Sequence, residues 1–312
     1  MISFFYDTDS EINLEIAKEY GIENNAIRFP YSICGETFYA DLGQTFDKKW
    51  FYSKINEGNV PTTSALNSEE FREYFEPEFE KGNEVFYVSF GTKFSAAFSM
   101  MDKTIEELKK KYPKLKFTRY DTKAISMGTG LLVISAAKAL SEGKTVPEVI
   151  KLLDQLTPFI NISLVVDDLS FLKRGGRLSA GKAFLGGILQ LKPVIKLTKA
   201  GTLEPFQSIS GKNKALKTVT QEAIENAKVN SELPFIIMNA NCPEDALHIE
   251  TVIRQSRPDL KIIQVDIGPV IGTHCGPGSI GLCFLGNERP ESTKTEDSFH
   301  KTHTFILSSQ GY

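Results

Sequence analysis

The stretch Val265–Gly286, VDIGPVIGTHCGPGSIGLCFLG, decides how the fold is interpreted. Its first part, residues 265–271, is mostly apolar and rich in β-branched side chains, and residues 280–285 are mostly apolar. Each part predicts a buried strand. Between them, Thr-His-Cys-Gly-Pro-Gly predicts a tight turn, because glycine reaches positive φ angles and proline fixes φ. The stretch therefore predicts two buried strands joined by a rigid, glycine-rich turn.

His274 lies inside that predicted turn. A histidine beside apolar strands is commonly a hydrogen-bonded core residue, whereas a histidine held in a rigid glycine turn is well placed to contact a ligand. Both interpretations stay open on the residues alone. The adjacent Cys275 does not by itself indicate a catalytic pair, because a nucleophile and its base must meet in space rather than in sequence.

The composition restricts the class of protein. The chain has 312 residues, enough for one large domain or two of ordinary size, and its hydrophobic content of 41% supports a large core. A net charge of −3 does not favour nucleic acid or an anionic membrane as a partner. We expect no secretory signal and no integral membrane segment, because a basic leader and a long apolar run are both missing. The four cysteines lack CxxC spacing, which argues against structural zinc and indicates free thiols in a reducing cytoplasm: Cys34, Cys242, Cys275 and Cys283.

Upstream of residue 160, predicted strands and helices alternate. Strands are predicted at residues 1–6, 26–31, 36–40, 84–90 and 115–120. Helices are predicted at residues 11–20, 47–56, 67–81, 96–111, 131–140 and 146–156. Asp9 and Ser10 are suited to cap the first helix, and Ser95 the fourth, while residues 121–130 read as a loop. This alternation predicts a parallel sheet covered by helices on both faces.

The pattern changes near residue 160. A strand at 160–166 precedes a short helix at 167–173, and two strands at 193–198 and 203–209 flank Ala200-Gly201, as in an antiparallel pair. Further elements follow: a helix at 212–229, a strand at 234–239 and a helix at 243–256. We predict an N-terminal α/β domain over residues 1–160, a C-terminal α/β domain with a mixed or antiparallel sheet over 161–286, and a polar tail over 287–312.

Three motifs resemble nucleotide or metal sites only in part. Residues 176–183 approach the phosphate loop GxxxxGK[ST], but Ala183 stands where a hydroxyl is needed and a predicted helix precedes the motif. Gly128-x-Gly130 lacks the third glycine of a dinucleotide-binding turn. Asp167-Asp168 is as typical of a helix N-terminus as of a metal site. We therefore expect neither a cofactor nor a metal.

Two hydroxyl-rich loops, Thr62-Thr63-Ser64 and Thr92 to Ser95, follow elements of the first predicted sheet. Loops at the carboxyl ends of parallel strands line the ligand crevice of α/β proteins. Hydroxyls and backbone amides at the start of the helix after Ser95 would suit an anion. Plain helix capping explains the same residues, and the two roles are compatible.

Seven motifs occur in a fixed order along the chain: Thr8–Ser10, Pro61–Ser64, Thr92–Ser95, Asp167–Ser179, Leu191–Pro193, Leu203–Pro205 and Gly268–Gly278. Together these motifs resemble the DegV family of bacterial fatty-acid-binding proteins, of the fatty acid kinase binding-subunit type, over residues 1 to about 286.

The resemblance implies two α/β domains that hold one long-chain fatty acid, such as palmitate or oleate, with its carboxylate at the domain interface and its acyl chain in a buried tunnel. In such proteins the carboxylate meets hydroxyls of the two early loops and the histidine of the last turn. Here these are Thr63, Ser95 and His274, with Ser64 adjacent. The implied role is a lipid carrier in fatty acid metabolism, without catalytic residues of its own.

Some members of the family present the fatty acid to a separate kinase, which forms acyl phosphate from ATP. The arginines implicated in that step match Arg174 and Arg177, but the family's later arginine-rich stretch reads Ser210-Gly211-Lys212 here. Lys212 would have to replace an arginine as a point charge, which is a poorer match to a phosphoryl group. Cys275 is a second departure, since the family usually carries threonine there.

The apolar chain of the expected ligand would dominate its affinity. About fifteen methylenes at about 0.8 kcal/mol each supply on the order of 10 kcal/mol before the entropy of binding is subtracted. The candidate tunnel residues are Phe184, Ile188, Ile271, Ile280 and Phe284, each of which is also typical of an ordinary core.

The alternative is an enzyme, a hydrolase or phosphotransferase that uses His274 with Cys275 or Arg177. The sequence has no nucleophile elbow, metal set or nucleotide loop, and this favours the carrier.

Overall fold

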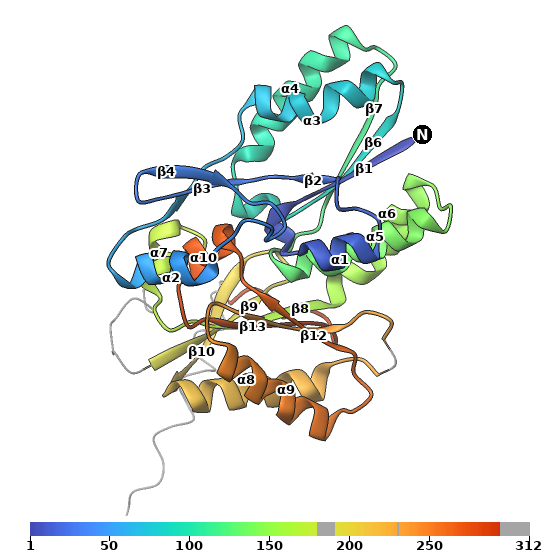
Figure 1. Cartoon of the computed structure of the whole chain (residues 1–312). Helices are drawn as coiled ribbons and strands as arrows, with labels where there is room; N and C mark the ends of the chain where they lie inside the picture. Colours follow the sequence, from blue (N-terminus) through green and yellow to red (C-terminus); the bar gives the residue numbers. More distant parts are fainter. Residues whose placement is uncertain (180–190, 230, 294–312) are drawn as a thin grey trace, which may run out of the picture.

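The computed structural model describes residues 1–179, 191–229 and 231–293. Within these ranges the strands form one parallel sheet, one mixed sheet and a small antiparallel sheet (Figure 1). The predicted α/β class with a parallel N-terminal sheet and a mixed C-terminal sheet is confirmed.

The N-terminal sheet is entirely parallel and is packed with aromatic side chains. In spatial order its strands are β2 (Ala26–Ile27), β1 (Ile2–Asp7), β6 (Glu84–Ser89) and β7 (Lys116–Asp121). Phe75 packs between Phe5 and Phe117, with ring centroids 5.5 and 5.2 Å apart, and so fixes one helix on this face of the sheet. The helices of this half are α1 (Leu14–Glu19), α2 (Lys48–Asn56), α3 (Ser68–Glu80), α4 (Ala97–Lys111), α5 (Met127–Ser141) and α6 (Val146–Leu156).

The mixed sheet forms the second layer. Its spatial order is β10 (Leu203–Ser210), β9 (Leu191–Leu197), β8 (Ile160–Val165), β13 (Ile280–Leu285), β11 (Phe235–Asn239) and β12 (Ile262–Asp266). Only the β11–β12 pair is parallel among these neighbours. Helices α8 (Lys212–Asn226) and α9 (Pro243–Ser256) cover its outer face, below the sheet in Figure 1. The inner face is left to pack against the N-terminal half.

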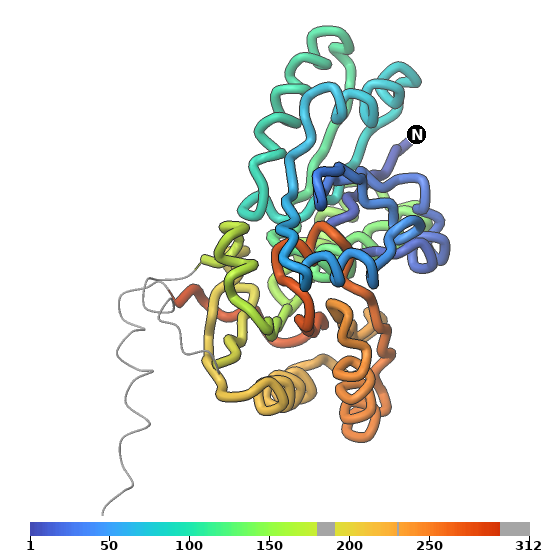
Figure 2. The backbone as a smooth tube through the Cα atoms, turned by 60° about the vertical axis from the view of Figure 1, so that its left-hand side comes forward, coloured from blue at the N-terminus to red at the C-terminus, as the bar shows by residue number. Residues whose placement is uncertain are grey.

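A third layer of small elements joins the two halves. Strands β3 (Pro30–Ile33), β4 (Glu36–Tyr39) and β5 (Thr62–Thr63) form the antiparallel sheet, and helix α7 (Ser170–Gly175) follows β8. Helix α10 (Pro269–Cys275) contacts α7, β3 and β5. In Figure 2 the orange-red α10 segment lies against blue segments of the N-terminal half. The stretch around residue 270 thus belongs in space to both halves.

The prediction of a strand over residues 265–271 was wrong. Strand β12 ends at Asp266, and residues 269–275 form helix α10. Pro269 occupies the first turn, where its missing N–H costs nothing, and the Gly268 N–H donates to Oε2 of Glu11 at 2.7 Å. The periodicity of a short apolar run does not distinguish a strand from a helix. The contact with Glu11, which lies far away in the sequence, could not be predicted from this stretch. The strand predicted at 280–285 is confirmed.

Two further predictions in the N-terminal half also needed correction. Asp9 and Ser10 do not cap helix α1, which begins at Leu14 with the side chain of Asn13 accepting the Ile16 N–H. Residues Thr8–Ser10 instead form a short 3₁₀ turn, η1. The predicted loop over 121–130 ends earlier, because α5 begins at Met127.

Gly128 and Gly130, which were predicted to lie in a loop, lie inside helix α5. Glycine is needed at these positions because the helix packs closely against its neighbours. A Cβ at Gly128 would lie 2.6 Å from the Ile162 side chain, and a Cβ at Gly130 would lie 2.7 Å from the Ser10 carbonyl oxygen. These glycines therefore mark close packing of α5 against the mixed sheet and η1.

Arg289, in the segment predicted as a polar tail, is 2% exposed. It donates from Nε to the Ile160 carbonyl oxygen at 2.8 Å and from Nη1 to the Lys123 carbonyl oxygen at 2.7 Å. The start of this segment thus binds the backbone of both halves.

Candidate functional site

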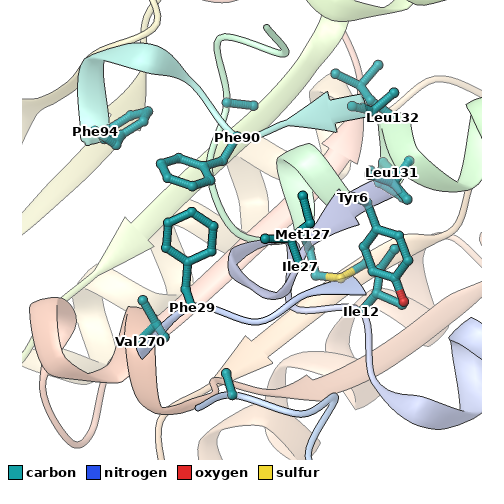
Figure 3. Close-up of a cluster of buried hydrophobic side chains, with 14 of the residues drawn as sticks. Tyr6, Ile12, Ile27, Phe29, Phe90, Phe94, Met127, Leu131, Leu132 and Val270 are labelled. Atoms are coloured by element: carbon teal, nitrogen blue, oxygen red, sulfur yellow. The ribbon is translucent and has the colours of Figure 1, made fainter. Parts of the chain in front are cut away.

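An apolar cavity lies between the carboxyl ends of the parallel strands and the inner face of the mixed sheet. From the first half it is lined by Asp9, Phe29, Thr63, Ser64, Ala65, Phe90, Phe94, Ser95, Ala96, Ile125 and Ser126. From the second half it is lined by Ile162, Leu164, Leu172, Arg177, Leu203, Met238, Ile267, Val270, Ile271, His274 and Cys275. Figure 3 shows part of its wall, where the rings of Phe29 and Phe90 pack in a T-shaped, edge-on arrangement near Val270. Most of the wall is hydrocarbon, and the polar groups are few.

Thr63 and His274 meet across the two halves of the chain. Oγ1 of Thr63 lies 2.9 Å from Nε2 of His274, and either atom can donate the hydrogen bond. Thr63 is held by the pairing of β5 with Tyr31 of β3, and His274 lies in the last turn of α10. The structure thus brings together two of the residues that the sequence analysis named as candidates for one site.

His274 is held neutral by its surroundings. Burial, followed by the nearby positive charge of Arg177, lowers the pKa of His274 to about 4. Its Nδ1 is buried and has no hydrogen-bond partner among the described residues. A Cβ at Gly175 would lie 2.2 Å from this nitrogen, so α7 approaches the imidazole as closely as only glycine allows.

Ser95 presents a free donor to the same cavity. Its Oγ accepts the Ala97 N–H at 3.1 Å, but Ser95 is not the predicted N-cap, because α4 starts one residue later and its N-cap is Ala96. Because this contact uses an acceptor position of the hydroxyl, the O–H remains able to donate into the cavity. Ser64 is more exposed and lines the cavity next to Thr63.

Arg177 supplies the positive charge of the cavity. Its Nε donates to the Phe94 carbonyl oxygen at 2.9 Å, and its Nη1 donates to the Gly175 carbonyl oxygen at 2.5 Å. In the described part of the chain it forms no ion pair. A guanidinium fixed by carbonyl groups keeps its charge available for an anion.

A family model described as "Uncharacterised protein, DegV family" matches residues 2–287. The chain belongs to the DegV family. A DegV domain-containing protein of Clostridium perfringens is 33% identical over 290 residues, covering 93% of this chain and 99% of the relative. The DegV-family fold is also found in two solved structures, each 24% identical. The protein from Thermus thermophilus has a TM-score of 0.78 and covers 91% of this chain and 99% of its own; the one from Bacillus subtilis has a TM-score of 0.75, with 90% and 98%.

The other predicted residues of this DegV-family chain lie apart from the Thr63–His274 contact. Arg174 is exposed, and its guanidinium lies over the Phe171 ring at 4.8 Å from the centroid. Lys212 is bound by two carboxylates, Asp245 at 2.8 Å and Asp167 at 3.2 Å. Neither side chain lines the cavity. Lys212 is therefore engaged in a structural ion-pair network.

The predicted tunnel residues are only partly brought together. Ile271 lines the cavity, whereas Ile280 and Phe284 lie in the core between the mixed sheet and helices α8 and α9. The reason is the two-residue alternation of β13, which turns these side chains to the outer face of the sheet. Phe184 and Ile188 lie outside the described residues.

Sequence reasoning missed several cavity residues, notably Asp9, Ser126 and Met238. Asp9 and Ser126 lie just beyond the carboxyl ends of β1 and β7, so the rule that located Thr92–Ser95 could also have located them. Met238 lies inside a strand that the sequence marks only as buried, and it gives no comparable signal.

Cys275 is not an activated nucleophile in this DegV-family chain. Burial raises the pKa of its thiol to about 12, so the thiolate is not populated at neutral pH. No cluster of metal-binding side chains occurs within the described ranges. None of the helices seen there is long and apolar enough to cross a membrane.

Proposed function

We propose that this protein binds one long-chain fatty acid, such as palmitate or oleate, in the cavity between its two halves. The observation that carries the proposal is the Thr63–His274 contact, which places polar groups at a cavity whose remaining wall is mostly hydrocarbon. A ligand with one polar end and a long apolar body is complementary to such a site.

The head of the ligand would be held by donors from three elements. If the neutral His274 donates from Nε2 to Thr63, the Thr63 hydroxyl can donate in turn to a carboxylate. The Ser95 hydroxyl supplies another donor, with Ser64 adjacent, and Arg177 supplies a compensating charge. Each hydrogen bond to a charged acceptor contributes about 1.5–3 kcal/mol.

Solved DegV-family structures support this class of ligand. The Thermus thermophilus and Bacillus subtilis proteins are described as fatty-acid-binding, and a Eubacterium eligens protein holds heptadecanoic acid. The Thermus thermophilus and Eubacterium eligens folds cover 91% and 92% of this chain. We infer that the same region of this chain accepts an acyl chain.

The experiment is to identify what the purified protein carries. We expect solvent extraction and mass spectrometry to yield about one long-chain fatty acid for each protein molecule, because the proposal places one fatty acid in one cavity. Delipidated protein should then bind added palmitate or oleate in an isothermal titration. A protein that carries no lipid and binds neither fatty acid would disprove the proposal.

We further propose that the protein acts as a carrier, not an enzyme. The protonated Cys275 thiol argues against the alternative in which His274 activates it, because a nucleophile needs a deprotonated sulfur. Release to a separate fatty acid kinase is the partnership that the family resemblance implies. The exposed Arg174 is the residue best placed to meet such a partner, whereas Lys212 is held by carboxylates.

A further inference from the structure

Asp9 has a buried carboxyl group and is not among the residues proposed above to hold the head group. It lies in turn η1, directly after strand β1, and it lines the same cavity as Thr63, Ser95 and His274. The residue is 5% exposed, and its Oδ1 has no hydrogen-bond partner among the residues that the structure describes. A buried polar atom without a hydrogen-bond partner costs free energy. Because this atom belongs to a residue that lines the cavity, a bound ligand could supply the missing partner.

Arg177 ties Asp9 to the head-group end of the cavity. The positive charge of this one side chain acts on both Asp9 and His274, and its Nε hydrogen bond ends on Phe94, the residue before Ser95. The carboxyl group and the imidazole are thus both near enough to Arg177 for its charge to act on them, and Ser95 lines the same cavity. No distance within 4.0 Å pairs Asp9 with Arg177 as a salt bridge in the described chain.

The surroundings of Asp9 favour its neutral form. The titratable groups around it are the carboxyls of Asp7 and Glu11, the phenol of Tyr87 on β6, and Arg177, with the neutral His274 on the same cavity. Burial first, and then the nearby carboxyl groups of Asp7 and Glu11, raise the pKa of Asp9 well above its ordinary value. A fatty-acid carboxylate would bring a further negative charge, and two carboxyl groups that share a buried site retain one proton between them.

We propose that Asp9 is a specificity-determining residue of the head-group site, which binds the fatty-acid carboxylate as a neutral acid through a hydrogen bond from its own carboxyl group. This inference rests on the proposed fatty-acid binding. A carboxylic acid that donates to a carboxylate forms a charge-assisted bond, which is shorter and stronger than a bond to a neutral acceptor. Asp9 therefore selects a carboxylate over an uncharged head group on the same acyl chain.

The test compares two ligands with one chain length, palmitate and palmityl alcohol, bound to delipidated wild-type protein, Asp9→Ala and Asp9→Asn. Asp9→Ala should bind palmitate about tenfold more weakly, or about 1.4 kcal/mol, and should lose much less affinity for the alcohol. A purely structural defect would weaken both ligands alike. Asp9→Asn keeps a donor and should bind palmitate more tightly than Asp9→Ala. Asp154→Asn is the matched control, because this exposed carboxyl lies outside the cavity, and its affinities should equal those of the wild type.

Three outcomes would overturn the role of Asp9. One is equal palmitate affinity in folded Asp9→Ala and wild type, and another is an equal loss for both ligands. The third is tighter palmitate binding by Asp9→Asn than by wild type, which would show an ionised Asp9 that repels the ligand; this outcome decides the question even if Asp9→Ala does not fold. Failure of the wild type to bind palmitate would instead refute the proposed function itself.

Discussion

At the scale of single residues, the proposed head-group site consists mainly of neutral hydrogen-bond donors. Burial lowers the pKa of His274 to about 4, so the imidazole is uncharged at neutral pH, and Thr63 and Ser95 are hydroxyls. Arg177 provides charge from a position fixed by two carbonyl groups. Neutral donors on rigid backbone orient a carboxylate without a mobile cation, so head-group geometry depends on individual hydroxyls.

Ser95→Ala should weaken fatty-acid binding by about 1–3 kcal/mol, because a charged acceptor loses one donor. It should also lower the free energy of unfolding by about 0.5–1 kcal/mol, because the Ala97 N–H loses the oxygen that accepts its hydrogen bond. Isothermal titration with palmitate and thermal unfolding of the delipidated protein measure the two effects separately.

Ser99→Ala is the control for this change, since Ser99 is exposed on the same helix, donates to the Ala96 carbonyl oxygen and does not itself line the cavity. Its palmitate affinity should equal that of the wild type. If Thr63→Ala/Ser95→Ala binds palmitate as tightly as the wild type, neither hydroxyl holds the carboxylate.

At the scale of elements, most of the strands and helices could be predicted from the sequence, because amphipathic period and caps are local signals. Helix α2, predicted at residues 47–56, spans Lys48–Asn56 with Asp47 as its N-cap, and α9 begins at Pro243 as predicted. Helix α10 could not be predicted, because its first turn is completed by Glu11, some 257 positions earlier in the chain. The glycines of α5 were misread for the same reason, since their need for close packing comes from β8 and η1.

Glu11 joins the start of α10 to turn η1 and should make stability depend on pH. Burial raises the pKa of Glu11 from 4.5 to about 8, so between these values the folded state holds a proton that the unfolded state has lost. Stability therefore falls as pH rises through this window and levels off above it. Glu11→Gln removes this titration and keeps an oxygen for the Gly268 N–H, so it should raise the melting temperature most at pH above about 8.

The expected gain is on the order of a few kcal/mol at most, since one pKa unit corresponds to about 1.4 kcal/mol. Melting temperatures of the two proteins, recorded from acid to alkaline pH, measure the difference. Asp7, whose pKa burial raises to about 7, and His274 titrate in both proteins and so cancel in the comparison. Glu57→Gln is a control on an exposed carboxyl. A difference between Glu11→Gln and wild type that does not change with pH would contradict this account.

At the scale of the whole molecule, the cavity exists only because two separately patterned halves face each other. The sequence located Thr63, Ser95 and His274 through their motifs, but it could not tell which face of β13 points inward, and so Ile280 and Phe284 were misplaced. Met238 and Leu203 line the cavity because their strands lie opposite the ends of β1, β6 and β7. Which residues line the cavity depends on how the two halves pack together, and a short stretch of sequence does not contain this information.

Presentation of the fatty acid to a kinase would also be a property of the whole molecule, and the structure separates the three cations proposed for it. Arg177 lines the cavity, Arg174 is exposed outside it, and Lys212 is held by Asp167 and Asp245. With a bacterial fatty acid kinase, ATP and palmitate-loaded protein, Arg174→Ala should therefore slow acyl phosphate formation several-fold and leave palmitate affinity unchanged. Arg177→Ala should reduce both the rate and the affinity, because Arg177 lines the cavity in which the carboxylate is proposed to bind.

Lys212→Arg should not raise the rate, because a guanidinium at this position would meet the same two carboxylates that hold the ammonium group. Arg254→Ala serves as the control arginine, since Arg254 is exposed on α9 and paired with Glu250 of the same helix. Labelled ATP gives the rate, and isothermal titration gives the palmitate affinity. A faster Lys212→Arg protein would show that Lys212 leaves its ion pairs to meet the partner. Equal rates in Arg174→Ala and wild type would remove Arg174 from the contact.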